Sequence, residues 1–404
     1  MENNNDNKVL NVPLLRFPEF TDEWKESVLS DFVERVKRKN KNNLCKLPLT
    51  ISAQYGLVDQ ISFFNKVIAS ENMSNYYLLH KGDFAYNKSY SSEYPWGAIK
   101  RLDCYEQGTL SSLYICFKPY SHVSSDFLTH YFETSKWHQG ISEIAVEGAR
   151  NHGLLNVGIQ DFFETRHCLP QSLLEQEKIA KFLNLIEERI ATQNKIIEKL
   201  QSLIKGLIDD IITLKCGQLV AFETLYSKAG EGGTPTTSNT EFYDNGSIPF
   251  IKIDDLSNKY LSANKDYITE LGLKKSSAWL IPTHSIIYSN GATIGAISIN
   301  KYPVCTKQGI LGIVPNTNID VEFLYYFMQS SYFQKEVERV VTEGTMKTAY
   351  LKDINHIKCP IPDLDRQKEI SHLLSVLSLK EDVERQLLQK YQIQKQYLLR
   401  KMFI

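Results

Sequence analysis

Apolar residues recur at alternating steps of four and three through the middle of the chain. Nine of the ten positions on this track are apolar, and Glu, Lys, Arg and Asp lie between them. A seam that repeats every 3.5 residues is typical of packed helices that bury one face and solvate the other. The pattern therefore predicts a long coiled-coil helix, roughly 55–60 Å from end to end. The track consists of Ile179, Leu183, Ile186, Ile190, Gln193, Ile197, Leu200, Ile204, Leu207 and Ile211.

The C-terminal segment repeats this track 191 residues later. The sequence before it repeats as well, with Gln-Glu-Lys-Ile at 176–179 and Gln-Lys-Glu-Ile at 367–370. Such a repeat predicts a second long helix that pairs antiparallel with the first. The second track consists of Ile370, Leu374, Leu377, Glu381, Glu384, Leu388, Tyr391, Lys395, Leu398 and Met402.

Three positions of the second track are charged. A buried, unpaired charge in the seam would be costly. We therefore expect Glu381, Glu384 and Lys395 to face solvent, an opposite charge or a partner protein.

Strand-like aromatic runs, separated by turn residues, precede each predicted helix. The predicted fold class is α+β: two globular domains joined by two long helices, with an approximate twofold internal repeat. If the helices pair antiparallel, they hold the two domains at opposite ends. The predicted segments are a disordered lead at 1–10, a first domain at 11–165, a helix at 166–215, a second domain at 216–358 and a helix at 359–404.

Composition limits the classes of protein to which this chain can belong. The seven cysteines form no Cys-x-x-Cys pair, which favours free thiols over a disulfide framework or a zinc site. The N-terminus has neither a basic region nor an apolar signal segment, and no apolar run is long enough to span a bilayer. We therefore expect a soluble, cytoplasmic protein without a membrane partner. The net charge of −1 argues against coating nucleic acid by bulk electrostatics, although local basic patches remain possible.

No catalytic constellation emerges from the sequence. There is no phosphate-binding G-x-x-x-x-G-K-[ST] loop, no dinucleotide fingerprint and no H-E-x-x-H metal motif. There is also no Asn/Asp-Pro-Pro-aromatic tetrapeptide of the kind with which amino-methyltransferases grip an adenine. We therefore expect a chain that is not an enzyme and has no catalytic residue, metal or cofactor of its own.

Side chains suited to base edges and phosphates gather in polar segments of both domains. Each is individually a weak signal, since a solvated loop has the same composition. The candidate DNA contacts of the first domain are Tyr86, Asn87, Lys88, Ser89, Tyr90, Lys100, Arg101, Arg150 and Asn151. Those of the second domain are Thr234, Thr236, Lys252, Ser289, Asn290, Thr293, Lys307, Gln308 and Lys347.

Nearly the whole chain after residue 10 resembles the specificity subunit of type I restriction-modification systems. The resemblance rests on the order of domains and helices, with PLLRFPEFTDEW at 13–24, GGTP at 232–235, IPFIKIDDL at 248–256 and ATIGA at 292–296. It implies two target recognition domains, each reading one half of a bipartite, asymmetric site in double-stranded DNA. The paired helices would act as a spacer that turns the separation of the half-sites into specificity.

The resemblance also implies partners. Two modification subunits would carry S-adenosylmethionine and methylate adenines, and restriction subunits would use ATP and Mg²⁺ to translocate and cleave DNA. The specificity subunit itself would be non-catalytic. Two other hypotheses stay open: a coiled-coil adaptor whose globular domains bind proteins, which the near-neutral charge slightly favours, and a stand-alone DNA methyltransferase or nuclease, against which the missing motifs argue.

Overall fold

The chain divides into two compact units. The computed structural model describes residues 11–404 apart from 67, 146–152, 214–216, 292 and 343–346, and it leaves out the side chains of 211–213. Unit 1 contains Met1–Thr192 and Leu388–Ile404, and unit 2 contains Gln193–Leu387. Each unit therefore holds one globular part and one portion of each of two long helices. The predicted lead at 1–10 lies outside the described residues.

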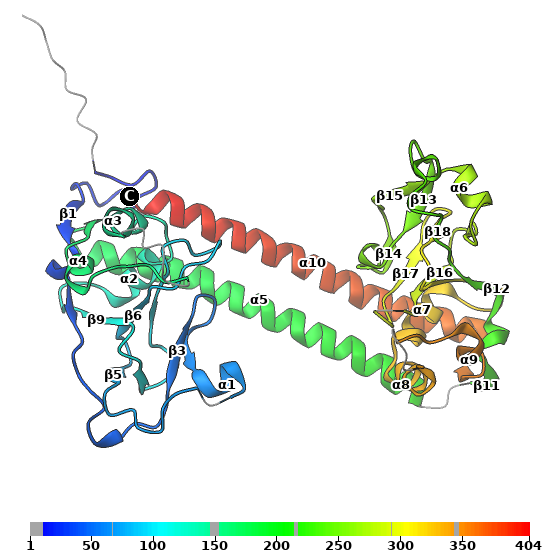
Figure 1. Cartoon of the computed structure of the whole chain (residues 1–404), viewed down its shortest axis with the longest axis horizontal. Helices are drawn as coiled ribbons and strands as arrows, with labels where there is room; N and C mark the ends of the chain where they lie inside the picture. Colours follow the sequence, from blue (N-terminus) through cyan, green and yellow to red (C-terminus); the bar gives the residue numbers. More distant parts are fainter. Residues whose placement is uncertain (1–10, 67, 146–152, 214–216, 292, 343–346) are drawn as a thin grey trace, which may run out of the picture. The chain divides into compact units, whose positions relative to one another are not determined.

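The two long helices are α5 (Leu173–Thr213) and α10 (Leu364–Met402). They lie within the segments for which the apolar track predicted helices, and they pack together in both units (Figure 1). In unit 2, Gln193 contacts Glu384 whereas Gln201 contacts Glu381, so the pairing runs antiparallel. The predicted α+β class and the pair of long helices are confirmed.

Unit 1 is built around a four-stranded sheet in the order β2-β9-β6-β7, with three strand pairs beside it: β1-β10, β3-β4 and β5-β8. Its strands are β1 (Lys25–Val28), β2 (Val33–Arg35), β3 (Leu49–Ser52), β4 (Gly56–Asp59), β5 (Tyr77–His80), β6 (Phe84–Asn87), β7 (Ala98–Arg101), β8 (Gln107–Leu110), β9 (Ile115–Pro119) and β10 (Arg166–Leu169). Its shorter helices are η1 (Leu29–Asp31), η2 (Lys41–Asn43), α1 (Gln60–Phe64), α2 (Ser125–Tyr131), α3 (His138–Ile144) and α4 (Ile159–Phe163).

One hydrophobic core joins the globular part of unit 1 to both long helices. It contains Phe117 from the sheet, Phe127 from α2, Leu183 from α5 and Leu398 from α10. The segment before β1 is tied to the same helices. Arg16 donates from Nε and Nη2 to the buried carboxylate of Glu175, at 2.7 and 2.8 Å.

Unit 2 has a five-stranded sheet in the order β12-β19-β16-β17-β14, a three-stranded sheet β15-β13-β18 and the pair β11-β20. Its strands are β11 (Gln218–Ala221), β12 (Tyr226–Glu231), β13 (Ile248–Ile251), β14 (Tyr260–Leu261), β15 (Asp266–Ile268), β16 (Ile286–Ser289), β17 (Ile297–Asn300), β18 (Cys305–Thr306), β19 (Ile310–Pro315) and β20 (Lys358–Ile361). Its shorter helices are η3 (Phe222–Leu225), η4 (Thr240–Phe242), η5 (Ile253–Asp255), α6 (Glu270–Lys274), α7 (Val321–Gln329), α8 (Ser331–Val340) and α9 (Leu351–Ile354).

The two units repeat the same order of elements. In unit 1 the strand β1 pairs antiparallel with β10, directly before α5; in unit 2, β11 pairs with β20, directly before α10. The sheet segments β9-β6-β7 and β19-β16-β17 also correspond. The apolar pattern predicted a first helix segment that begins at residue 166. Residues 166–169 form a strand of the globular part instead. The repeat seen in the sequence thus extends to the strands.

A buried glutamine fixes the beginning of each long helix. In unit 1, Oε1 of Gln176 accepts a hydrogen bond of 2.8 Å from the backbone N–H of Ser124, the N-cap of α2, and its Nε2 donates to the Pro170 carbonyl at 2.9 Å. In unit 2, Gln367 accepts from the N–H of Asp320, the N-cap of α7, at 2.8 Å and donates to the Pro362 carbonyl at 2.8 Å.

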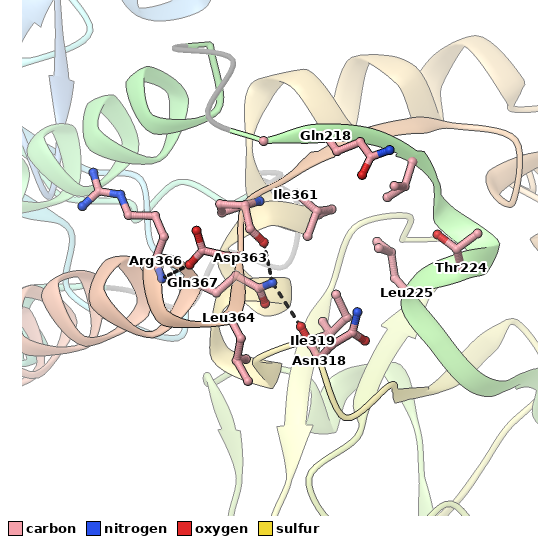
Figure 2. Close-up of a pocket in the computed structure, with 13 residues that line it drawn as sticks. Gln218, Thr224, Leu225, Asn318, Ile319, Ile361, Asp363, Leu364, Arg366 and Gln367 are labelled. Carbon is pink, nitrogen blue, oxygen red and sulfur yellow. Dashed lines mark hydrogen bonds between the residues drawn. The ribbon is translucent and has the colours of Figure 1, made fainter.

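Gln367 also donates to the Asn318 carbonyl at 3.2 Å (Figure 2). These are the glutamines of the repeated Gln-Glu-Lys-Ile and Gln-Lys-Glu-Ile sequences. Each satisfies backbone groups that would otherwise be buried without partners. The glutamine of each repeated tetrapeptide therefore anchors a long helix to the globular part of its unit. We call this set of contacts the glutamine lock.

The predicted seam positions line the contact between the long helices. The fully buried ones are Ile179, Leu183, Ile186, Gln193, Ile197, Ile370, Leu374, Glu384, Leu398 and Met402. The half-buried ones are Ile190, Leu200, Ile204, Leu207, Leu377, Glu381, Leu388, Tyr391 and Lys395. The side chain of Ile211 lies outside the described residues. The 3.5-residue period thus identifies the packed face of both helices.

The three charged seam positions all meet an opposite charge, as we expected. Lys395 lies 2.6 Å from Oε1 of Glu187 and 2.8 Å from Oε2 of Glu133. Glu381 pairs with Arg385 one turn along α10 at 2.7 Å. Glu384 pairs with Lys380 and also accepts a hydrogen bond from the Gln193 amide across the seam. Hydrogen bonding to Lys380 and Gln193 lowers the pKa of Glu384 and favours its charged form.

None of the helices among the described residues combines the length and the apolarity needed to cross a membrane.

Replacing Gln367 with Ala tests the glutamine lock. The N–H of Asp320 and the carbonyls of Pro362 and Asn318 would lose their partner, so we expect the apparent free energy of unfolding of unit 2 to fall by roughly 2–3 kcal/mol in a urea titration. The matched control is Gln386→Ala on the exposed side of the same helix, which should change stability by less than about 0.5 kcal/mol. Equal effects of the two substitutions would contradict the assignment.

Unit 1 should lose stability in mild acid through His167. Burial lowers the pKa of His167 from 6.5 to about 4, and the ring bonds Tyr131 Oη at 2.9 Å and Thr165 Oγ1 at 2.8 Å. Because the folded pKa is depressed, the unfolded chain binds the proton first. The contribution of His167 to the free energy of unfolding is therefore complete above pH 6.5. It falls by about 3 kcal/mol in total as the pH falls toward 4. Unfolding curves of His167→Gln should decline less steeply over this range than those of the exposed-histidine control His122→Gln.

Candidate nucleic-acid interface

In unit 2 the Gly-Gly-Thr-Pro segment after β12 packs against the turn between β18 and β19. Gly232 donates to the Ile310 carbonyl at 2.9 Å and Gly233 to the Thr306 carbonyl at 3.1 Å. A Cβ on Gly232 would lie 2.1 Å from the Thr306 oxygen, so only glycine allows this approach. The two glycines thereby bring two polar loops side by side.

These loops carry four of the predicted contact residues. The backbone N–H of Gln308 donates to Oγ1 of Thr234 at 3.4 Å, and Lys307 and Gln308 are exposed. Thr234 is half-buried, and Thr236, two residues further along the chain, is exposed. Thr234, Thr236, Lys307 and Gln308 therefore form one polar surface at the end of the five-stranded sheet, which we call the unit 2 loop surface.

Two predicted contacts in unit 2 need correction. Ser289 and Asn290, at the end of β16, are both 0% exposed. The Asn290 amide donates to the Ala349 carbonyl at 3.1 Å, and its backbone exchanges further bonds with Gly309 and Ala349. Their burial excludes direct contact with a base, and we assign them instead to holding the loops beneath the unit 2 loop surface.

The remaining candidates of unit 2 lie at the surface but are dispersed. Lys252 is bound through Nζ to Asp266 at 2.8 Å, at the edge of the three-stranded sheet. Thr293 and Lys347 are exposed in loops. The structure does not group these three with the unit 2 loop surface.

In unit 1 the corresponding loop follows β6, the strand equivalent to β16. Lys88 accepts a bond of 2.9 Å from the N–H of Leu155, and Tyr90 donates to the Gly153 carbonyl at 3.0 Å. Ser89 and Tyr90 are exposed, and Asn87 and Lys88 are half-buried. Asn87, Lys88, Ser89 and Tyr90 thus form a continuous unit 1 loop surface.

Tyr86 does not belong to this surface. It is 0% exposed, its ring stacks on Phe162 at 4.9 Å, and its hydroxyl donates to the Trp96 carbonyl at 3.0 Å. Burial raises its pKa. The predicted contact at Tyr86 is therefore wrong, because alternation along β6 turns this side chain into the core.

The Arg101 side chain is bound by polar groups of its own unit. Its guanidinium binds Asp103 and Asp126 at 2.6 Å each and Ser125 Oγ at 3.0 Å, which ties β7 to the first turn of α2. Arg150 and Asn151 lie outside the described residues.

Lys100 lines a cavity of 780 Å³ in unit 1. One wall is the end of α10, with Gln392, Gln396 and Arg400, and Lys136 lies on another. Lys136 and Arg400 are exposed. Sequence reasoning missed these two cations, since α10 was interpreted only as a spacer; the basic run Arg400-Lys401 at its end was the available signal.

A second cavity type occurs in both units, beside the beginning of the long helix. In unit 2 it measures 640 Å³ and includes Gln218, Thr224, Asp363 and Arg366 (Figure 2). In unit 1 a cavity of 640 Å³ borders Ser124 of α2 and the first turns of α5. The two linings differ: the unit 2 cavity reaches back to β11, whereas the unit 1 cavity extends along α5 to Glu188.

Beside the 780 Å³ cavity lies an ionic cluster formed by buried His130, half-buried Glu187 and Lys395, and exposed Glu133. Burial lowers the pKa of Lys395, but the two carboxylates raise it by more, so the ammonium is held charged. Burial raises the pKa of Glu133, but Lys395 outweighs it and the net shift is downward. The ligand atoms of His130, Glu133 and Glu187 all lie within 4.8 Å of one another, a grouping that could hold a metal.

Residues 226–391 match the family described as type I restriction modification DNA specificity domain. Curated proteins that the chain resembles are specificity subunits of type I restriction enzymes. A specificity subunit of Escherichia coli type I enzyme EcoR124I/EcoR124II is 27% identical over 210 residues, which cover 50% of this chain and 52% of that protein. The MjaIX specificity subunit of Methanocaldococcus jannaschii is 32% identical over 150 residues, covering 36% and 34%. The chain therefore spans about half, or less, of the length of these curated relatives.

Solved structures of specificity subunits share the fold over more of the chain. The S subunit from M. genitalium aligns with a TM-score of 0.54 and 15% identity, covering 97% of this chain and 99% of that one. A chain from a study of assembly and conformational transition of the type I R-M system aligns with a TM-score of 0.59 and 16% identity, covering 94% and 97%. At these identities the likeness establishes the fold alone.

The unit 2 loop surface predicts a specific effect on DNA affinity. Lys307→Ala removes an exposed cation, so we expect weaker DNA binding and a shallower dependence of log K on log salt, by about one unit of slope. Fluorescence anisotropy of the full-length chain over a salt series measures both. In the control Lys252→Ala the lost charge is paired with Asp266, and the slope should change less. Identical slopes for wild type and Lys307→Ala would remove Lys307 from the interface.

Proposed function

We propose that this chain is the DNA-recognition subunit of a type I restriction-modification complex. In this proposal the globular part of each unit reads one half of a bipartite, asymmetric site in double-stranded DNA. The observation that carries it is that polar loops lie at the same end of equivalent strands: the loop after β6 in unit 1, and the turn before β19, beside the end of β16, in unit 2. In unit 2 Lys307 and Gln308 are exposed. In unit 1 Ser89 and Tyr90 are exposed, and Asn87 and Lys88 are half-buried.

The chemistry of these loops suits DNA. Asn and Gln side chains can pair with adenine, and Lys side chains bind phosphates or guanine. The exposed ring of Tyr90 adds apolar contact area next to Lys88. The loops differ in composition between the units, with Asn87-Lys88-Ser89-Tyr90 in one and Lys307-Gln308 in the other. This difference in composition between the two units supports two different half-sites.

The paired helices supply the second part of the proposal. Their apolar seam and the two glutamine locks fix each globular part to the helices of its own unit. We infer that the helices set the spacing of the half-sites and dock two modification subunits, which bring S-adenosylmethionine. Restriction subunits would bring ATP and Mg²⁺. The complete assembly would act in the cytoplasm, and this chain would contribute no catalytic group.

A map of methylated adenines tests the proposal. DNA from cells that express this chain with its modification subunit is compared with DNA from cells that lack this chain. We expect a split motif of two short specified blocks separated by a fixed, unspecified gap. The double substitution Lys307→Ala/Gln308→Ala should relax one block, and Asn87→Ala/Lys88→Ala should relax the other.

Unchanged methylation in the presence of a stable complex would reject DNA recognition. That result would favour a coiled-coil adaptor that binds proteins through its globular parts. The net charge of −1 is compatible with this second function.

A further inference from the structure

The ionic cluster of unit 1 has an unusual donor. His130 is 0% exposed, at the end of α2, and its Nε2 lies 2.7 Å from Oδ1 of Asn184 on α5. A carbonyl oxygen only accepts hydrogen bonds, so Nε2 carries a proton and donates it to Asn184. The other nitrogen, Nδ1, then presents a lone pair. No group among the described residues forms a hydrogen bond with it.

This lone pair faces two carboxylates. Nδ1 of His130 lies 3.7 Å from Oε1 of Glu187, and an oxygen of Glu133 completes the group within 4.8 Å. Three electron donors around one point require a cation between them. The Lys395 ammonium supplies it in part, at 2.6 Å from Glu187 and 2.8 Å from Glu133. A second ammonium, Lys100 Nζ, lies 3.9 Å from Oε1 of Glu133.

We propose that His130 Nδ1, Glu133 and Glu187 form a binding site for a divalent transition-metal ion such as Zn²⁺, which takes the place of the Lys395 ammonium. One imidazole and two carboxylates are a donor set that Zn²⁺ and Co²⁺ accept at about 2.0–2.2 Å. Two ligands at that distance from one ion lie about 3–4 Å apart, which fits the 3.7 Å between Nδ1 and Glu187.

The surroundings fit a metal in two further respects. Metal-bound histidines usually donate their second N–H to a fixed acceptor, and Asn184 provides that acceptor here. The ammonium also has space to move, because Lys395 lines the 780 Å³ cavity together with Gln392 and Gln396. A divalent ion in its place would neutralise both carboxylates and connect the end of α2 with α5 within unit 1. This site is independent of the proposed DNA recognition.

Cobalt binding to the full-length chain, freed of metal by a chelator, tests the proposal. We expect one Co²⁺ per chain with visible d–d absorption, displaced by Zn²⁺, and a rise in the melting temperature on addition of Zn²⁺. His130→Gln should abolish these signals, because the glutamine keeps a donor for Asn184 but has no Nδ1 lone pair. Lys395→Met should tighten Co²⁺ binding about tenfold or more, since no ammonium has to be displaced.

The matched control is His122→Gln, which changes an exposed histidine of the same unit and should leave Co²⁺ binding as in the wild type. The melting temperature of metal-free His130→Gln shows whether that variant is folded. Absence of Co²⁺ absorption in both the wild type and Lys395→Met would overturn the proposal. Absorption that persists in folded His130→Gln would also overturn it, because the ion would then bind elsewhere.

Discussion

Two buried amides hold each globular part to its long helices. Gln176 and Gln367 each accept the N–H of a helix N-cap and donate to the carbonyl of the proline that precedes the long helix. These contacts set the direction in which each long helix leaves its globular part. If the long helices set the distance between two half-sites, as we propose, they need such a junction, because a loose one would let that distance vary.

The seam between the helices combines apolar burial with a few polar contacts. Burial of Ile, Leu and Met side chains supplies a favourable but non-directional contribution. Gln193 with Glu384 and Lys395 with Glu187 add contacts that only one register satisfies. A single polar seam residue can fix the register of a coiled coil at some cost in stability. The charged positions of α10 therefore act as register markers rather than as defects of the repeat.

In the candidate interface, residue type alone predicts the exposure of some side chains and fails for others. Polar residue types pointed to loops at the surface, where Lys307 and Gln308 are exposed and Lys88 is half-buried. The same reasoning failed for Tyr86, Ser289 and Asn290, which share those loops but are buried. Whether a polar side chain at a strand end faces solvent depends on register and on the segment that packs over it. Tyr86 illustrates this dependence, because its ring lies against Phe162, a residue 76 positions away.

The sequence by itself determined the two long helices, their packed face and the internal repeat, because helical periodicity is a local property that survives in a single chain. It also carried the resemblance to specificity subunits of type I restriction-modification systems. Only the tertiary structure decided that β10 and β20 belong to the globular parts, and that His130, Glu133, Glu187 and Lys395 meet in one cluster. Those residues come from three separate helical regions, and no spacing in the chain records their proximity. Contacts between distant segments depend on how the core packs, which is settled only when all elements are placed together.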